Sequence, residues 1–247
     1  CSRDWSSDVC SSDLTELFEI LDKLKSIPHL RLGKSFNLSK ILQEYESIPD
    51  EDFHAYESRA YIDDIREIIE KNWKGCSLLS SNGQTYGDLI EGPKSLKNLI
   101  TSAGKKCPYM MEVISELGDR NQCIARIMKI KSGGQLSWHS HAYDYGVGKG
   151  SKNLMTIHIP IISPPKFKYS VMSLRDNRLT DLELEQPKIY SKWYNPGEAW
   201  LFNSYHMHNV YNYDDHDRVS LMLYLNIQDR KSTRLNSSHG YISYAVF

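Results

Sequence analysis

The chain has 247 residues and a formal net charge of −1, and 40% of its residues are hydrophobic. The charge is near neutral and the sequence contains no run of basic residues. Both features argue against nucleic acid or an anionic membrane as a partner. No apolar run reaches the roughly 18 to 20 residues that a membrane-spanning helix needs. The composition therefore predicts a soluble protein whose partner is a small molecule or a peptide.

The two ends of the chain differ from the rest in origin. Read back into codons, residues 229–239 match a common sequencing-library adapter in one frame, and residues 4–14 match its reverse complement. We therefore expect residues 1–14 and 229–247 to be adapter-derived and not native. Outside them the cysteines are Cys76, Cys107 and Cys123, an odd number at wide spacing. This pattern fits neither a disulfide framework nor a CxxC zinc site, and it favours a reducing, cytoplasmic location.

Between residues 15 and 120 the apolar residues follow helical spacing. Ile41, Leu42 and Tyr45 recur at such intervals, and two further stripes repeat the spacing at residues 17–24 and 62–69. Stripes of this kind are typical of helix sides that face a core. We therefore expect residues 15–120 to form a helical N-terminal region that packs on the rest of the domain.

From Cys123 onward the pattern changes to short segments rich in β-branched and aromatic residues, separated by turns that contain Gly, Pro and Asn. The segments are IARIMKI, NLMTIHIPII, KYSVMSL, AWLFN and VSLMLYLNI. Several strands at this spacing are typical of an antiparallel sandwich or barrel. The sequence thus predicts a β domain at residues 121–228 and, with the helices before it, an α+β fold.

Two histidine pairs stand out in the β half, namely His139 with His141 and His206 with His208. On a strand, residues i and i+2 point to the same face, so each pair can direct two imidazoles at one point. Imidazole is a common protein ligand for iron, zinc, copper and nickel. Two such pairs from distant segments predict a metal site that keeps open coordination positions.

Five stretches between residues 107 and 227 carry a likeness to a known family: CPYMMEVI, ARIMKIKSGGQLSWHSH, NLMTIHIPI, NPGEAWLFNS and HNVYNYDDHDRVSLMLYLNI. The sequence here resembles the aspartyl/asparaginyl β-hydroxylases and the related free-proline hydroxylases. In that family a first histidine ends a glycine-containing strand lead-in, as His139 does. A distal histidine follows a PGE-type turn, as His208 does, and an arginine follows ten residues later, as Arg218 does.

The resemblance implies a double-stranded β-helix, which is a jelly-roll or cupin-like barrel. It implies an enzyme that uses Fe(II), 2-oxoglutarate and O₂, with ascorbate as the reductant, to hydroxylate an amino acid or an amino-acid residue. His139 and His208 would ligate the iron, Arg218 would pair with the remote carboxylate of 2-oxoglutarate, and His158 would contribute to the same pocket. The planar arginine fork suits bidentate recognition of a carboxylate.

Two positions depart from the family pattern. Many members carry an acid two residues after the first histidine, where this chain has His141. The third metal ligand is therefore open between His141, Asp144 and water, and strand alternation favours His141. Members also carry an arginine two residues before the His158 position, where this chain has Thr156. The co-substrate contacts of that strand therefore differ from those of the family.

Two other functions fit the same residues. Gly133 ahead of His139 and His141, together with His208 followed by Asn212, also fits a cupin with a three-His metal site that does not use 2-oxoglutarate. However, the glutamate that cupins place shortly after the second histidine is absent, and a cupin gives no role to Arg218. The third function is a non-catalytic binding domain that keeps the fold without turnover, and an assay for succinate release separates it from the enzyme.

Overall fold

The computed structural model describes residues 29–55, 72–87, 98–118, 123–139, 154–172, 189–192, 194–203, 206 and 208–226. The two terminal segments that we expect to be adapter-derived, and the helical stripes at residues 17–24 and 62–69, lie outside these ranges. In the described part of the chain, no helix is long and apolar enough to cross a membrane.

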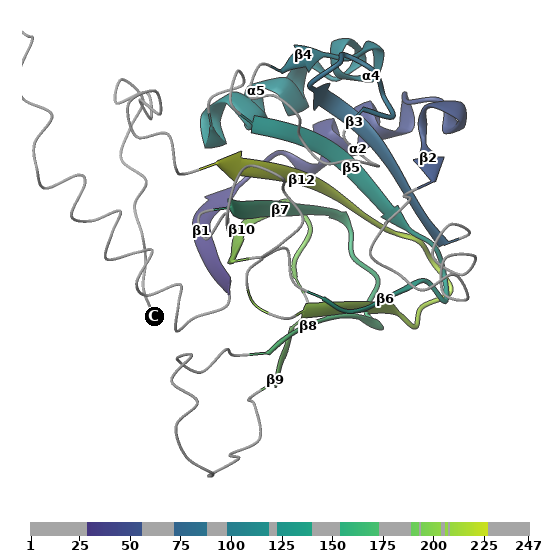
Figure 1. The fold of residues 1–247 in the computed structure, drawn as a ribbon, viewed down its shortest axis with the longest axis vertical. Helices are drawn as coiled ribbons and strands as arrows, with labels where there is room; N and C mark the ends of the chain where they lie inside the picture. Colours follow the sequence, from purple (N-terminus) through teal and green to yellow (C-terminus); the bar gives the residue numbers. More distant parts are fainter. Residues whose placement is uncertain are drawn as a thin grey trace, which may run out of the picture.

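The larger of two antiparallel sheets forms the centre of the molecule (Figure 1). Its strands follow the order β1 (His29–Ser35), β10 (Glu198–Asn203), β7 (Leu154–Ile162), β12 (Arg218–Asn226), β5 (Cys123–Ile130), β3 (Trp73–Ser80) and β2 (His54–Ala55), and β4 (Leu99–Ile100) pairs with β3. The long β12 lies between β5 and β7 and pairs with both. A residue of β12 is therefore held from both sides.

A smaller four-stranded sheet faces the large one. Its order is β6 (Gln135–His139), β11 (His208–Asn212), β8 (Phe167–Met172) and β9 (Ile189–Lys192). Every pairing in both sheets is antiparallel. The two facing sheets make a β-sandwich of the jelly-roll kind, which confirms the antiparallel sandwich predicted from the strand pattern.

Three helices cover the face of the large sheet that points away from the small one (Figure 1). They are α2 (Leu38–Glu46), α4 (Ser102–Lys106) and α5 (Pro108–Leu117), and a 3₁₀ turn, Asp50–Asp52, follows α2. The predicted stripe of Ile41, Leu42 and Tyr45 lies on α2 and packs in the core beneath. The cysteines of the described residues, Cys76, Cys107 and Cys123, are buried and form no disulfide.

The period-two alternation of β12 divides its side chains between two cores. Val219, Leu221 and Leu223 join the core beneath the helices. Met222 packs instead against the aromatic core between the two sheets. Both faces of this sheet are covered. A strand can therefore place apolar side chains under the helices and polar or charged side chains on the face toward the small sheet.

Residues 15–120 supply strands as well as helices in their described part. β1 pairs with β10 and β3 pairs with β5, so this region extends the large sheet at both edges. Periodicity does not reveal β3, because its residues are buried on both faces and show no alternation of apolar and polar positions. The strands predicted from residue 123 onward are all present as β5, β7, β8, β10 and β12.

Candidate active site

An aromatic layer fills the space between the two sheets. Phe167 and Tyr169 enter it from the small sheet, and Trp200 and Phe202 enter it from the large one. The ring centroids of Tyr169 and Phe202 are 4.7 Å apart. This layer excludes water, so the polar groups that it encloses interact at a low effective dielectric constant.

The backbone register places the two predicted iron ligands side by side. β11 pairs with β6 so that His208 lies directly opposite His139. In antiparallel sheets, the Cβ atoms of directly opposed residues are about 4.5 to 5.5 Å apart. Two segments nearly seventy residues apart in the sequence thus meet at one position. The side chain of His139 and all of His141 and Asp144 lie outside the described residues.

The imidazole of His208 is held in the tautomer that a metal ligand requires. The side chain is 5% exposed, and its Nδ1 lies 2.8 Å from the carbonyl oxygen of His206. A carbonyl oxygen can only accept, so Nδ1 carries the proton and Nε2 carries the lone pair. The ring of Tyr169 stacks on that of His208, with centroids 5.7 Å apart and planes 11° from parallel. Such orientation by a backbone carbonyl and a packed neighbour is typical of metal-ligating histidines.

His206 has a different position from the one that strand alternation predicts. It lies in a bend before β11, which begins at His208, and its side chain is 2% exposed. The same-face argument for residues i and i+2 therefore does not apply to this pair. The contribution of His206 that the structure shows is its carbonyl group, which orients His208.

Arg218 is a buried cation at the start of β12. Its side chain is 3% exposed, and its guanidinium carbon lies 4.8 Å from the centroid of the Phe167 ring. Among the described residues, Nε has no hydrogen-bond partner and no carboxylate contributes to the electrostatics of the guanidinium. Burial lowers the pKa of Arg218 to about 10, against the opposing influence of the nearby Tyr169 and Tyr194. The group is still charged at neutral pH, and a buried charge of this kind needs an anion.

His158 lies in the same layer as Arg218. On β7 it pairs in register with Met222 of β12 and Trp200 of β10, and it is 6% exposed. Its ring centroid is 4.4 Å from that of Phe202 and 5.8 Å from that of Tyr169. Thr156, two residues earlier on the same strand, is 2% exposed. The predicted pocket residues His158 and Arg218 are thus brought to one inter-sheet space.

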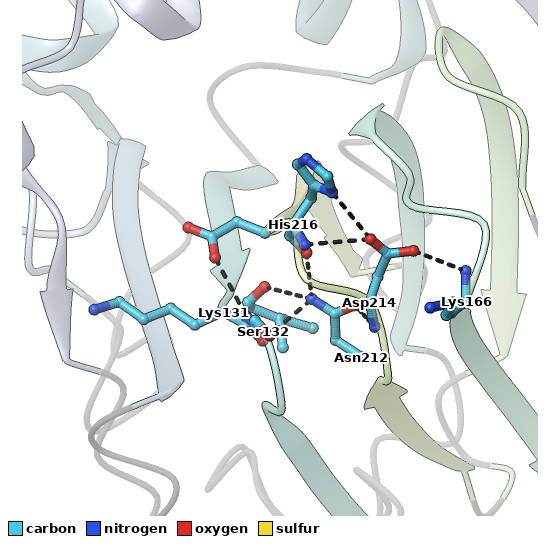
Figure 2. Close-up of polar contacts among 8 residues, drawn as sticks. Lys131, Ser132, Lys166, Asn212, Asp214 and His216 are labelled. Carbon is cyan, nitrogen blue, oxygen red and sulfur yellow. Dashed lines mark hydrogen bonds and ion pairs between the residues drawn. The ribbon is translucent and has the colours of Figure 1, made fainter.

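A polar network fixes the connection from β11 to β12, which leads from His208 to Arg218. Figure 2 shows Asn212 at its centre, with its Nδ2 within 3.2 Å of the carbonyl oxygens of Ile130, Lys131 and His216. Asp214 lies beside it, and its carboxylate accepts from Nδ1 of His216 at 3.1 Å. Asn212 is fully buried. The network therefore sets the position at which β12, and with it Arg218, begins.

The sequence predicts the histidines and Arg218 as site residues, but it does not point to the residues that pack around them. Tyr169 and Tyr194 interact electrostatically with Arg218. In the sequence, each looks like an ordinary aromatic residue of a strand or a turn. Asn212 entered only through the cupin alternative. Among the described residues no group of three His, Cys, Asp or Glu is close enough to hold a metal. The His139 side chain and His141 are not among those searched.

Comparisons with known proteins agree with this arrangement. The family model described as Aspartyl/Asparaginyl beta-hydroxylase matches residues 35–226. A search of curated proteins found no significant relative. Among solved structures, the non-heme alpha ketoglutarate dependent carbocyclase SnoK from nogalamycin biosynthesis is similar in fold, with a TM-score of 0.54, 10% identity and coverage of 91% of this chain and 94% of the other.

Two further solved structures share the fold. The epimerase SnoN from the same biosynthesis has a TM-score of 0.52 at 10% identity, over 87% of this chain and 84% of the other. An oxidoreductase of the 2OG-Fe(II) oxygenase family from Burkholderia pseudomallei has a TM-score of 0.50 at 10% identity, over 91% and 94%. At such low identity these likenesses concern the fold alone. The family match covers every predicted site residue, from His139 to Arg218, and the chain therefore belongs to the aspartyl/asparaginyl β-hydroxylase family and is an oxidoreductase.

Proposed function

We propose that this protein is an Fe(II)- and 2-oxoglutarate-dependent dioxygenase that hydroxylates an amino acid or an amino-acid residue. The observation that carries the proposal is the buried, charged Arg218, which has no carboxylate partner in the described part of the chain, in a protein of this family. A guanidinium in such a place is suited to receive the remote carboxylate of 2-oxoglutarate through two parallel hydrogen bonds. A solved structure of the same fold, the epimerase SnoN, binds Fe³⁺ and alpha ketoglutarate together.

The metal would be held by His139 and His208, with His141 as the third ligand and Asp144 or water as the alternatives. The fit rests on the register of His139 and His208 and on the Nδ1 proton of His208, which leaves Nε2 as the ligating atom. When bound, iron, 2-oxoglutarate and O₂ supply the oxidising power that places one oxygen atom in a C–H bond and the other in succinate, with release of CO₂.

The chain's own residues position and enclose this chemistry. Arg218 would anchor one end of the co-substrate, while His158 lines the same aromatic layer. The layer keeps water from competing for the guanidinium. Ascorbate, as the reductant that keeps iron as Fe(II), belongs to the same proposal.

Arg218 also separates this function from the two alternatives. A cupin with a three-His site that does not use 2-oxoglutarate has no use for a buried cation beyond the metal ligands. A binding domain without turnover would have no reason to keep the tautomer of His208 fixed. No described residue favours either alternative over the dioxygenase.

The proposal is tested by succinate formation from 2-oxoglutarate by the full chain with Fe(II), ascorbate and O₂. The reaction is run with pools of free amino acids and of peptides. We expect succinate from the wild-type protein, none from His208→Ala, and at least tenfold less from Arg218→Met, because losing one partner of a buried charge pair costs about 2 to 5 kcal/mol. Tyr213→Phe, a change at an exposed ring, is the matched control.

The outcomes separate the candidate functions. A rise in succinate with one member of a pool would name the substrate class. Metal binding without succinate formation under any pool would favour the three-His cupin or the binding domain, and the dioxygenase proposal would be abandoned.

A further inference from the structure

Tyr194 is a second polar group enclosed near Arg218. Its side chain is 3% exposed, and its buried hydroxyl has no hydrogen-bond partner among the residues that the structure describes. Leaving a buried hydroxyl unsatisfied typically costs about 1 to 3 kcal/mol, so such groups usually have a reason for their position. None of the roles proposed above includes this residue.

The phenol is held rigidly by the turn that leads into β10. Gly197 adopts a φ of +81° there and donates its N–H to the carbonyl of Pro160 at 2.8 Å. Glu198 then accepts from the indole nitrogen of Trp200 at 3.1 Å and pairs with Arg31 at 2.9 Å. The fixed Trp200 packs on the Tyr194 ring, with centroids 5.0 Å apart. A ring confined in this way directs its hydroxyl to one place.

Tyr194 lies within the electrostatic range of Arg218. The rings of Tyr194 and Tyr169 meet edge to face with centroids 6.0 Å apart, and the charge of Arg218 acts on both phenols. Burial nevertheless raises the pKa of Tyr194, so its hydroxyl stays protonated at neutral pH. Among the described residues these two atoms lack a partner: Nε of Arg218 can only donate, and the hydroxyl of Tyr194 can donate as well as accept. A ligand that satisfies both must be an acceptor, and beside a cation the fitting acceptor is a carboxylate.

We propose that the Tyr194 hydroxyl donates a hydrogen bond to the same remote carboxylate of the 2-oxo acid that Arg218 binds. Tyr194 is then a residue that positions the co-substrate at the end away from the metal. This inference rests on the proposed function, because it takes 2-oxoglutarate as the ligand of Arg218.

The test measures equilibrium binding of two probes to the full chain by isothermal titration calorimetry. The probes are Mn(II), in place of Fe(II) so that no turnover occurs, and 2-oxoglutarate added to the Mn(II)-loaded protein. Tyr194→Phe keeps the ring and removes only the hydroxyl. We expect it to weaken 2-oxoglutarate binding by about tenfold or more, the usual effect of losing a hydrogen bond to a charged group. The affinity for Mn(II) should not change.

Two companion variants separate the inference from the proposed function. Tyr213→Phe, which removes an exposed hydroxyl, should bind both probes like the wild type. Arg218→Met should lose most of the 2-oxoglutarate affinity. If Arg218→Met does so and Tyr194→Phe binds 2-oxoglutarate normally, the inference about Tyr194 is wrong and the dioxygenase stands. A loss of Mn(II) affinity in Tyr194→Phe would also overturn it, since the phenol would then act on the metal end or on the fold. If the wild-type protein does not bind 2-oxoglutarate, both the inference about Tyr194 and the proposed dioxygenase function are wrong.

Discussion

Arg218, at the scale of one residue, shows how a proposed binding site can oppose stability. Its guanidinium is enclosed beside the face of Phe167 and has no carboxylate partner among the described residues. Moving such a charge out of water costs free energy that only an anion can return. The folded protein without an anion at this position therefore carries a free-energy cost, which the proposed role of Arg218 in co-substrate binding explains.

We predict that Arg218→Met raises the free energy of unfolding of the ligand-free protein by about 1 to 3 kcal/mol, because an apolar side chain of similar length fills the site without a charge. The pKa of Arg218 falls from its ordinary value of 12.5 to about 10 on folding. A base whose pKa is lowered by folding destabilises the fold while it is charged, and that cost diminishes only as the pH rises above 10. The gain from the substitution should hence be constant between about pH 6 and 9, which urea unfolding at several pH values would check.

The residue scale also shows what sequence reasoning can reach. The histidine pairs that contain His139 and His208 stand out by their spacing, whereas Arg218 is predicted only by the family resemblance. The register of β6 and β11 places His139 and His208 opposite each other. The sequence does not predict that the Tyr194 hydroxyl is buried without a hydrogen-bond partner among the described residues. Which phenols are paired depends on tertiary packing, which local sequence does not show. The tautomer of His208 likewise depends on a bend at His206 that interrupts the expected strand.

At the scale of elements, the end of β11 is tied to the turn between β5 and β6. Gly133 donates its N–H to the carbonyl of Asn212, and the N–H of Asn212 is donated to the carbonyl of Gly134, both at 2.9 Å. The Asn212 side chain adds contacts to three further carbonyls. Backbone and side chain thus act together to hold one crossing point between the two sheets.

We predict that Asn212→Ala lowers the free energy of unfolding by about 1 to 3 kcal/mol, because buried carbonyl oxygens lose their donor. It should also weaken 2-oxoglutarate binding, because Arg218 begins β12 two residues after His216, whose carbonyl oxygen accepts from the Asn212 side chain. Asn209→Ala, on the same strand but half-buried, is the control. Chemical unfolding and calorimetry measure the two effects, and unchanged co-substrate affinity in a destabilised Asn212→Ala would limit the network to a role in folding.

Helix α5 begins without a cap of its own. Its N-cap residue, Cys107, makes no side-chain hydrogen bond to the first turn. The carboxylate of Glu44 on α2 takes this role, accepting from the N–H of Tyr109 at 2.6 Å and of Met110 at 2.8 Å. A negative charge at a helix N-terminus is favourable in itself, so one side chain joins two helices of the outer layer.

Glu44→Ala should therefore lower the free energy of unfolding by about 1 to 2 kcal/mol, the usual cost of losing an N-cap. Glu46→Ala, at an exposed position of the same helix, should stay within about 0.5 kcal/mol of the wild type. Thermal unfolding followed by circular dichroism compares the two. Equal melting temperatures would show that the cross-helix cap contributes nothing.

The sequence predicts helices and strands correctly where a segment has a clear residue pattern. It fails where a strand is buried on both faces, because apolar and polar residues then no longer alternate. β7 and β12 were found because β-branched and aromatic residues gather in them. β3 was missed because both of its faces are covered, and β2 and β4 are too short, at two residues each, to show any pattern. Strands that precede α5 complete the large sheet. Their place in it depends on tertiary pairing, which a local sequence pattern does not reveal.

For the whole molecule, the proposed site draws on both sheets. Arg218 and His158 lie on the large sheet, whereas His139 and His208 lie on the small one. A metal with its co-substrate would therefore join the two halves of the sandwich. Any ligand that binds only the folded state stabilises it, by about 2.7 kcal/mol at one hundred times its dissociation constant.

We predict that Mn(II) and 2-oxoglutarate together, each at about one hundred times its dissociation constant, raise the melting temperature by about 5 to 10 °C. Mn(II) alone should give only part of this rise. In Arg218→Met the increment from 2-oxoglutarate should disappear while that from Mn(II) remains. Differential scanning calorimetry measures both, and an increment from 2-oxoglutarate that persists in this variant would place its carboxylate elsewhere.

The ten-residue interval between His208 and Arg218 has a geometric meaning. It is the length of β11 together with the connection that crosses from one sheet to the other. Since alternate residues of β12 face opposite cores, inserting or deleting a single residue in that connection would exchange Arg218 with an aliphatic neighbour such as Val219. The cation would then lie under the helices, and an apolar side chain would occupy the pocket. Only insertions or deletions of an even number of residues in this connection would keep Arg218 on its face of the sheet. Changes by an odd number should therefore be selected against.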